Sequence, residues 1–165
     1  MTRQIKVGNV PIGGGADVVI QSMLNTKTTD VEGSLAQIRS LAAAGCQVAR
    51  LAVPNMEAAR GFAEICKESV LPLVADIHFD YRLAIAAAEG GASKIRINPG
   101  NIGGEDRVKA VVDVCKDKHI PIRIGVNGGS LEKELLEKYG HPTAQALVES
   151  PFGHLELLEK YGFYD

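Results

Sequence analysis

The chain has 165 residues, of which 45% are hydrophobic and 23% are charged. That balance is typical of a single soluble globular domain and argues against intrinsic disorder. Lys and Arg number 18 against 20 Asp and Glu, and aromatic residues make up only 5%, so a general nucleic-acid binder is disfavoured. No apolar run approaches the roughly 20 residues that cross a bilayer, and no apolar signal segment follows Met1. We therefore expect a cytoplasmic protein with no nucleic-acid or membrane partner.

Short β-branched segments alternate with amphipathic helical segments along the chain. A β-hairpin comes first, because Gly8-Asn9 separates two short apolar segments, and the glycines at 13–15 link it to the rest. The β-branched segments that follow predict five further strands. These cover residues 18–23, 47–53, 73–77, 94–98 and 122–126.

Helices are predicted after each of these strands. The first is expected to begin at a capping box formed by Thr29 and Glu32, while Asn55 and Asp80 are expected to cap the second and third. After the last strand we expect three helical pieces that begin near residues 130, 143 and 150. Pro151 would occupy the first helical position of the last piece.

Repeated βα units predict a parallel sheet, either open and doubly wound or closed into a barrel. The strand at 94–98 decides between them, because Lys94, Arg96 and Asn98 share one face and Ile95 and Ile97 the other. The other strands show the same contrast near their carboxyl ends. An open sheet covered by helices on both faces would be apolar on both. We therefore assign an α/β fold of the parallel (β/α)8 TIM-barrel type.

The length fits only part of such a barrel, since eight βα units need well over about 200 residues. We expect residues 1–165 to form the N-terminal part of a TIM-barrel substrate-binding domain. Residues 1–15 would be the hairpin and glycine linker. Residues 16–165 would make a partial barrel of about five βα units.

Three arginines, Arg50, Arg96 and Arg123, occupy equivalent positions near the carboxyl ends of three predicted strands, with Lys94 one layer below Arg96. Asp76 is the one carboxylate that opposes them. Buried guanidinium groups need an anionic partner, and their N–H groups match phosphate oxygens. The pattern predicts a diphosphate site. The alternative is that each arginine pairs with a carboxylate from strands outside this sequence.

Other polar residues follow the same strands. Asp76 and His78 share a face and are candidates to orient hydroxyl groups or pass a proton, although a structural hydrogen-bonded pair is the alternative. Asn98 and Asn127 begin the next two loops and could bind ligand oxygens. The cysteines at 46, 66 and 115 are too far apart for a metal knuckle, and we expect them to bind no metal.

Several long motifs resemble one family, the 4-hydroxy-3-methylbut-2-enyl diphosphate synthases of the methylerythritol phosphate route to isoprenoids. The resemblance extends from Ile5 to Tyr164, with one departure at Gly15-Ala16-Asp17, where the family carries a proline. The motifs that carry it lie at residues 21–26, 28–31, 48–54, 75–80, 95–101 and 124–132.

This resemblance implies an oxidoreductase that opens the ring of 2-C-methyl-D-erythritol 2,4-cyclodiphosphate and removes a hydroxyl group. Two electrons come from ferredoxin or flavodoxin through a 4Fe–4S cluster, which three cysteines and a glutamate hold in a C-terminal iron–sulfur domain. None of those ligands maps onto this chain, so we expect the chain alone to bind no cluster and to be inactive. Family members act as homodimers.

The resemblance also implies roles for individual residues. Asp76 and His78 would be catalytic polar groups near the reacting carbons. The substrate contacts would be Arg50, Arg96, Asn98, Arg123 and Asn127.

Two alternative functions stay open at this point. A pterin-binding transferase also uses a TIM barrel with polar strand ends, but it would need a flat slot for an aromatic ring. A non-catalytic half-barrel that binds anions is the other alternative.

Overall fold

The computed structural model describes residues 2–165, without the side chains of residues 99, 100 and 130. Its centre is a parallel sheet of five strands that neighbour one another in chain order. All five predicted strands are confirmed, each shorter than expected. The strands are β3 (Gln21–Met23), β4 (Val48–Ala52), β5 (Leu73–Asp76), β6 (Lys94–Ile97) and β7 (Ile122–Ile124).

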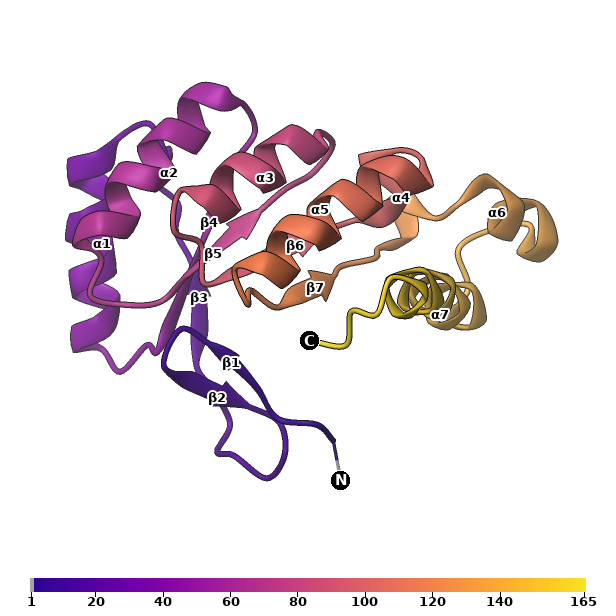
Figure 1. Ribbon diagram of the computed structural model, residues 1–165, viewed down its shortest axis with the longest axis horizontal. Helices are drawn as coiled ribbons and strands as arrows, with labels where there is room; N and C mark the ends of the chain where they lie inside the picture. Colours follow the sequence, from indigo (N-terminus) through magenta and orange to yellow (C-terminus); the bar gives the residue numbers. More distant parts are fainter. Residues whose placement is uncertain (1) are drawn as a thin grey trace.

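Helices cover one face of this sheet (Figure 1). They follow the strands one by one, as α1 (Val31–Ala43), α2 (Met56–Glu68), α3 (Tyr81–Glu89) and α5 (Glu105–Asp117), with a single short turn, α4 (Pro99–Ile102), before α5. Apolar strand residues such as Leu51 and Ile95 are fully buried against helix residues such as Phe62 and Val111. One face of the sheet is therefore an apolar core, as expected for the wall of a β/α barrel.

A hairpin of β1 (Ile5–Val7) and β2 (Val10–Ile12) lies away from these helices (Figure 1). Val7 packs with Val48 and Val74, which belong to the face of the sheet that the helices leave uncovered. At the turn, Gly8 has a φ of 59°, and a Cβ there would lie 3.1 Å from Pro72. The hairpin thus closes the amino-terminal end of the inner face, and the carboxyl-terminal end is left for polar groups.

The first helix begins differently from the prediction. The side chain of Asp30, not Thr29, accepts a hydrogen bond from the backbone N–H of Gly33 at 3.0 Å, so the predicted capping box is wrong. Gly33 leaves room for this contact, because a Cβ there would lie 2.3 Å from the Asp30 carboxylate. The caps predicted at Asn55 and Asp80 are confirmed by their bonds to the next helix turn.

The C-terminal segment contains a 3-10 turn, η1 (Gly128–Ser130), and two helices, α6 (Lys133–Tyr139) and α7 (Ala144–Lys160). Thr143 caps α7 as expected, but Pro151 lies inside this helix, so the separate helix predicted from residue 150 is wrong. An internal proline removes one backbone donor and its ring crowds the preceding turn, yet α7 continues through Pro151, with Ala146 and Ser150 buried before it and Leu158 after it. Among the described residues, no helix has the length and apolarity to span a bilayer.

Candidate functional site

The register of the sheet arranges the inner-face side chains in rows. Arg50, Val74 and Lys94 are aligned on β4, β5 and β6 and form a lower row. The prediction of equivalent positions for the three arginines is therefore wrong for Arg50, because the register of β4 aligns it with Lys94. Two residues further along the strands, toward their carboxyl ends, lies an upper row. The upper row consists of Ala52, Asp76, Arg96 and Arg123.

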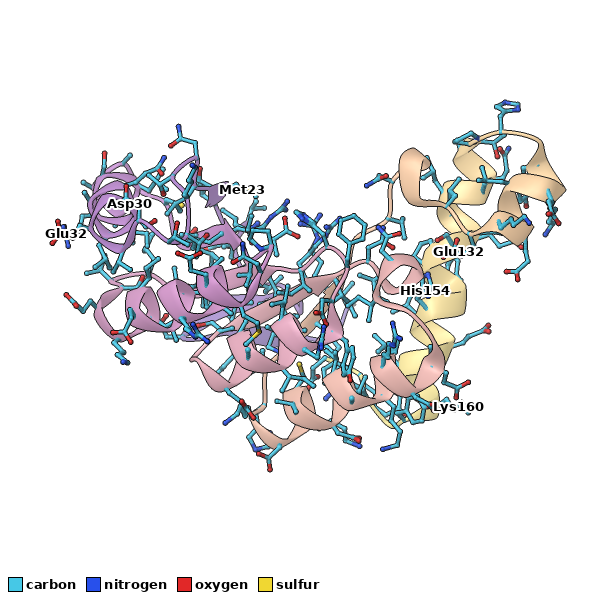
Figure 2. The ribbon with its side chains drawn as sticks, turned by 90° about the horizontal axis from the view of Figure 1, so that it is seen from above. Met23, Asp30, Glu32, Glu132, His154 and Lys160 are labelled. Carbon is cyan, nitrogen blue, oxygen red and sulfur yellow. The ribbon has the colours of Figure 1, made fainter. Side chains whose placement is uncertain are left out.

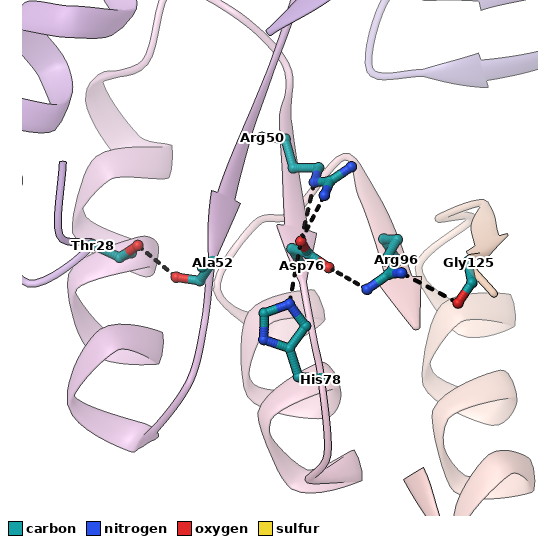
Figure 3. Close-up of polar contacts among 7 residues, drawn as sticks. All are labelled: Thr28, Arg50, Ala52, Asp76, His78, Arg96 and Gly125. Atoms are coloured by element: carbon teal, nitrogen blue, oxygen red, sulfur yellow. Dashed lines mark hydrogen bonds and ion pairs between the residues drawn. The ribbon is translucent and has the colours of Figure 1, made fainter. Parts of the chain in front are cut away.

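Asp76 is the centre of an ion-pair cluster (Figure 3). One carboxylate oxygen accepts from Nε of Arg50 at 3.1 Å and lies 2.9 Å from Nη2, and the other accepts from Nη1 of Arg96 at 3.0 Å. Nε2 of His78 is 3.5 Å from the same carboxylate. Asp76 is 1% exposed, and such a buried carboxylate needs several donors. Two of the three predicted arginines are therefore paired within this chain.

Gly125 completes the environment of Arg96. Nη2 of Arg96 donates to the carbonyl oxygen of Gly125 at 3.2 Å, and a Cβ on Gly125 would lie only 2.1 Å from Nε of Arg96. Sequence reasoning did not select Gly125. The sequence signal for Gly125 was its position, because it lies between Arg123 and Asn127 on the polar face of the strand predicted at residues 122–126.

Two further cations on this face have no carboxylate partner in the part of the chain that the structure describes. Arg123 is exposed beside Arg96, and Lys94 is 8% exposed in the lower row. Among the described residues, no hydrogen bond or ion pair engages either side chain. Burial lowers the pKa of Lys94, and the nearby charges of Arg123 and Arg50 lower it further. The four cations thus face one carboxylate, and the inner face is suited to bind an anion.

The two asparagines are placed at the same end of the sheet. Asn98 directly follows β6 and is 3% exposed. The side-chain oxygen of Asn127 accepts from the N–H of Gly129 at 3.0 Å and so orients the loop after β7. A third loop is fixed by Thr28, whose hydroxyl donates to the carbonyl of Ala52 at 2.6 Å (Figure 3). Thr28 was not predicted, because nothing in its sequence context marks this tertiary contact.

The three cysteines do not fit a 4Fe–4S cluster, whose ligands are thiolates gathered at one point. Cys66 lies in α2 and Cys115 in α5, and burial raises the pKa of both thiols to about 12. Cys46 is buried before β4, with its sulfur 3.2 Å from the carbonyl oxygen of Val48. No three His, Cys, Asp or Glu side chains in the described part of the chain form a group that could hold a metal ion.

Parallel βα units with one helix-covered face and polar carboxyl ends define a protein of the TIM-barrel class. Residues 2–165 match the GcpE TIM-barrel domain, and the chain belongs to this family.

Similar proteins include 4-hydroxy-3-methylbut-2-en-1-yl diphosphate synthases (flavodoxin). The protein from Idiomarina loihiensis is 61% identical over 99% of this chain and 44% of its own length. The protein from Bacillus subtilis is 60% identical over 99% of this chain and 44% of its own length. This chain therefore spans less than half the length of these curated relatives.

A solved structure with a related fold is dihydropteroate synthase from Xanthomonas albilineans, in complex with indole-2-carboxylic acid and 6-chloroguanine. The TM-score is 0.51 at 20% identity, over 84% of this chain and 53% of that chain. At this identity the likeness concerns the fold alone, so it does not favour a pterin-binding function.

Proposed function

We propose that this chain is the substrate-binding barrel portion of a 4-hydroxy-3-methylbut-2-en-1-yl diphosphate synthase. Its ligand would be 2-C-methyl-D-erythritol 2,4-cyclodiphosphate, bound on the inner face near the carboxyl ends of β4 to β7. The observation that carries the proposal is the surplus of cations there, where Asp76 is the one carboxylate among the described residues that faces Arg50, Lys94, Arg96 and Arg123. A diphosphate is a ligand whose charge matches that surplus. The names of the relatives point to this reaction.

The residues of this site would have different roles in ligand binding. Asp76 holds Arg50 and Arg96 in place before any ligand arrives, so little side-chain freedom remains to be lost on binding. Arg123, whose guanidinium pairs with none of the described residues, can bind a phosphoryl group in a bidentate manner. Asn98 and Asn127 would bind further ligand oxygens. Asp76 and His78 would orient the hydroxyl groups near the reacting carbons, and His78, at 41% side-chain exposure, is accessible to a ligand.

The electron-transfer part of the reaction belongs outside residues 1–165 in this proposal. The relatives' names specify flavodoxin as the electron donor. We infer that a C-terminal domain holds the 4Fe–4S cluster and that the complete protein acts as a cytoplasmic homodimer. The cysteines of this chain supply no step of that chemistry.

Calorimetry of the 165-residue chain with the cyclodiphosphate tests the proposal. We expect binding that weakens about ten- to a hundred-fold in Arg123→Ala, because one charged hydrogen-bond donor is lost. Arg60→Ala, which removes an exposed arginine of α2, is the matched control and should bind as the unchanged chain does.

A pterin without phosphate groups is the second ligand in this experiment. No binding of the pterin is expected. Binding of the pterin but not of the cyclodiphosphate would instead support the transferase alternative. Equal affinity for the cyclodiphosphate and for sulfate would support a general anion binder.

A further inference from the structure

Lys94 occupies an unusual place for a lysine. It lies in the lower row of the inner face, two residues before Arg96, and is 8% exposed. Val74 is its aligned neighbour on β5, and Val74 in turn packs against Val7 of the hairpin. Lys94 therefore has the apolar Val74 beside it in its own row, and Asp76 and Arg96 in the row above.

As far as the structure describes them, the surroundings of Lys94 contain cations and no available carboxylate. Arg50 lies in the same row, and Arg123 lies in the row above on the neighbouring strand. Both are close enough to lower the pKa of Lys94, after the larger effect of burial. The two oxygens of Asp76 are already bound by Arg50 and Arg96. Among the described residues, no acceptor binds the Lys94 ammonium. An ammonium group on a largely buried side chain, with no carboxylate partner among the described residues, is poorly compensated, and a bound anion would compensate it.

We propose that Lys94 and Arg123 together bind one phosphoryl group on the inner face, beside the pairs that Asp76 makes with Arg50 and Arg96. This inference rests on the proposed function and deepens it. In this arrangement Asp76 holds Arg50 and Arg96 in place, whereas the charges of Lys94 and Arg123 are available to the ligand. Lys94 thereby becomes a substrate-binding residue.

Proton uptake is the consequence that distinguishes Lys94 from the arginines. A dianion beside the ammonium favours its charged form, so binding should raise the pKa of Lys94 toward the ordinary value. A guanidinium keeps its charge at every pH at which a protein is folded, so lysine is the cation type on this face whose charge depends on pH. Affinity for the anion should therefore fall as the pH rises through the lowered pKa of Lys94.

Nuclear magnetic resonance of the chain with isotope-labelled lysine tests this inference. Sulfate is the probe, because it keeps two negative charges throughout the pH range and any proton taken up belongs to the protein. The Lys94 signal is assigned by its loss in Lys94→Met. We expect Lys94 to titrate below the other lysines, and saturating sulfate to raise its pKa by about one unit or more. We also expect Lys94→Met to weaken sulfate binding about tenfold.

Lys67→Met is the matched control, since Lys67 is an exposed residue of α2 that pairs with Glu64. It should leave both the Lys94 titration and the sulfate affinity unchanged. If sulfate shifts the backbone signals of β6 and β7 until they saturate but leaves the Lys94 titration unchanged, the inference about Lys94 is overturned and the anion site still stands. An absence of sulfate-dependent shifts in β4 to β7 would contradict the anion site itself. Because the titration uses the unaltered chain, a folding defect in Lys94→Met would not obscure the result.

Discussion

Gly125 and Arg96 can occupy the same region of the inner face only because residue 125 has no side chain. A Cβ there would lie 2.1 Å from Nε of Arg96 and 2.5 Å from its Nη2. The guanidinium instead lies against the backbone of Gly125 and donates to its carbonyl oxygen while it also holds Asp76. The missing side chain at Gly125, directly after β7, thus determines where the guanidinium of Arg96 lies.

Gly125→Ala should move the Arg96 side chain, because the new methyl group would overlap the guanidinium. We expect binding of the cyclodiphosphate to weaken about tenfold, as one charged contact is lost or misplaced. Calorimetry measures this change, with circular dichroism to verify the fold. Gly104→Ala is the control, since a Cβ there meets no atom within 4 Å and its φ is −63°. Equal effects of the two substitutions would contradict the steric argument.

Asp76→Asn should destabilise the fold, because Arg50 and Arg96 would lose their shared countercharge. Removing one partner of a buried ion pair costs about 3–5 kcal/mol, and the partial exposure of both arginines places the expected loss near the lower end. His78→Ala should cost less than about 1 kcal/mol, because His78 is far more exposed and lies 3.5 Å from Asp76. Urea unfolding measures both values. Similar losses in the two variants would refute the central role of Asp76.

His78 also has an expected role in turnover. In a full-length family member, replacement of the histidine equivalent to His78 by alanine should lower kcat with little change in substrate affinity, as expected for a group that acts on the bound substrate. Steady-state kinetics with reduced flavodoxin measures the two effects separately. A loss of affinity with unchanged kcat would instead make His78 a binding residue.

Glu132 joins the segment after β7 to α7 (Figure 2). Its carboxylate accepts from the hydroxyl of Ser150 at 3.0 Å and contacts Nε2 of His154. Burial acts to raise the pKa of Glu132, but hydrogen bonds from its own backbone N–H, from Ser150 and from His154 outweigh burial and leave the pKa below its ordinary value.

A lowered carboxyl pKa contributes stability at pH values above the unfolded-state pKa of about 4.5, and this contribution disappears as the pH falls through the folded-state value. Glu132→Gln should therefore lower the thermal midpoint at pH 6 and have a smaller effect at pH 3.5. Glu156→Gln, at an exposed position of α7, is the control and should change neither midpoint. An equal effect of Glu132→Gln at both pH values would contradict the charged interaction.

The buried thiols of Cys66 and Cys115 predict a loss of stability at alkaline pH. Burial raises the pKa of each to about 12, whereas the unfolded thiols ionise near 9. The contribution of each thiol to the stability of the folded state is complete below pH 9 and falls as the pH rises toward 12, by about 1.4 kcal/mol per thiol at pH 10. Urea unfolding at pH 8 and pH 10 should show a smaller decrease in a Cys66→Ala/Cys115→Ala variant than in the unchanged chain. The same decrease in both proteins would show that other groups cause it.

Local sequence patterns predicted much of this molecule. The alternation of Lys94, Arg96 and Asn98 with Ile95 and Ile97 identified a polar and an apolar face, because successive strand residues point to opposite sides. The caps at Asn55 and Asp80 were predictable because a short polar side chain directly before a helix can accept a hydrogen bond from the backbone of the first turn. The motifs at strand ends identified the family, since they recur as contiguous segments.

Tertiary structure decided which of these groups meet. Arg50 and Arg96 reach Asp76 across 26 and 20 residues of sequence, and only the register of β4, β5 and β6 places them beside the same carboxylate. Register depends on the packing of whole strands and helices, and a shift by one residue would turn each side chain to the opposite face. Long-range packing also buries Lys94 without a partner among the described residues, and it keeps α7 continuous through Pro151. No local pattern encodes either feature.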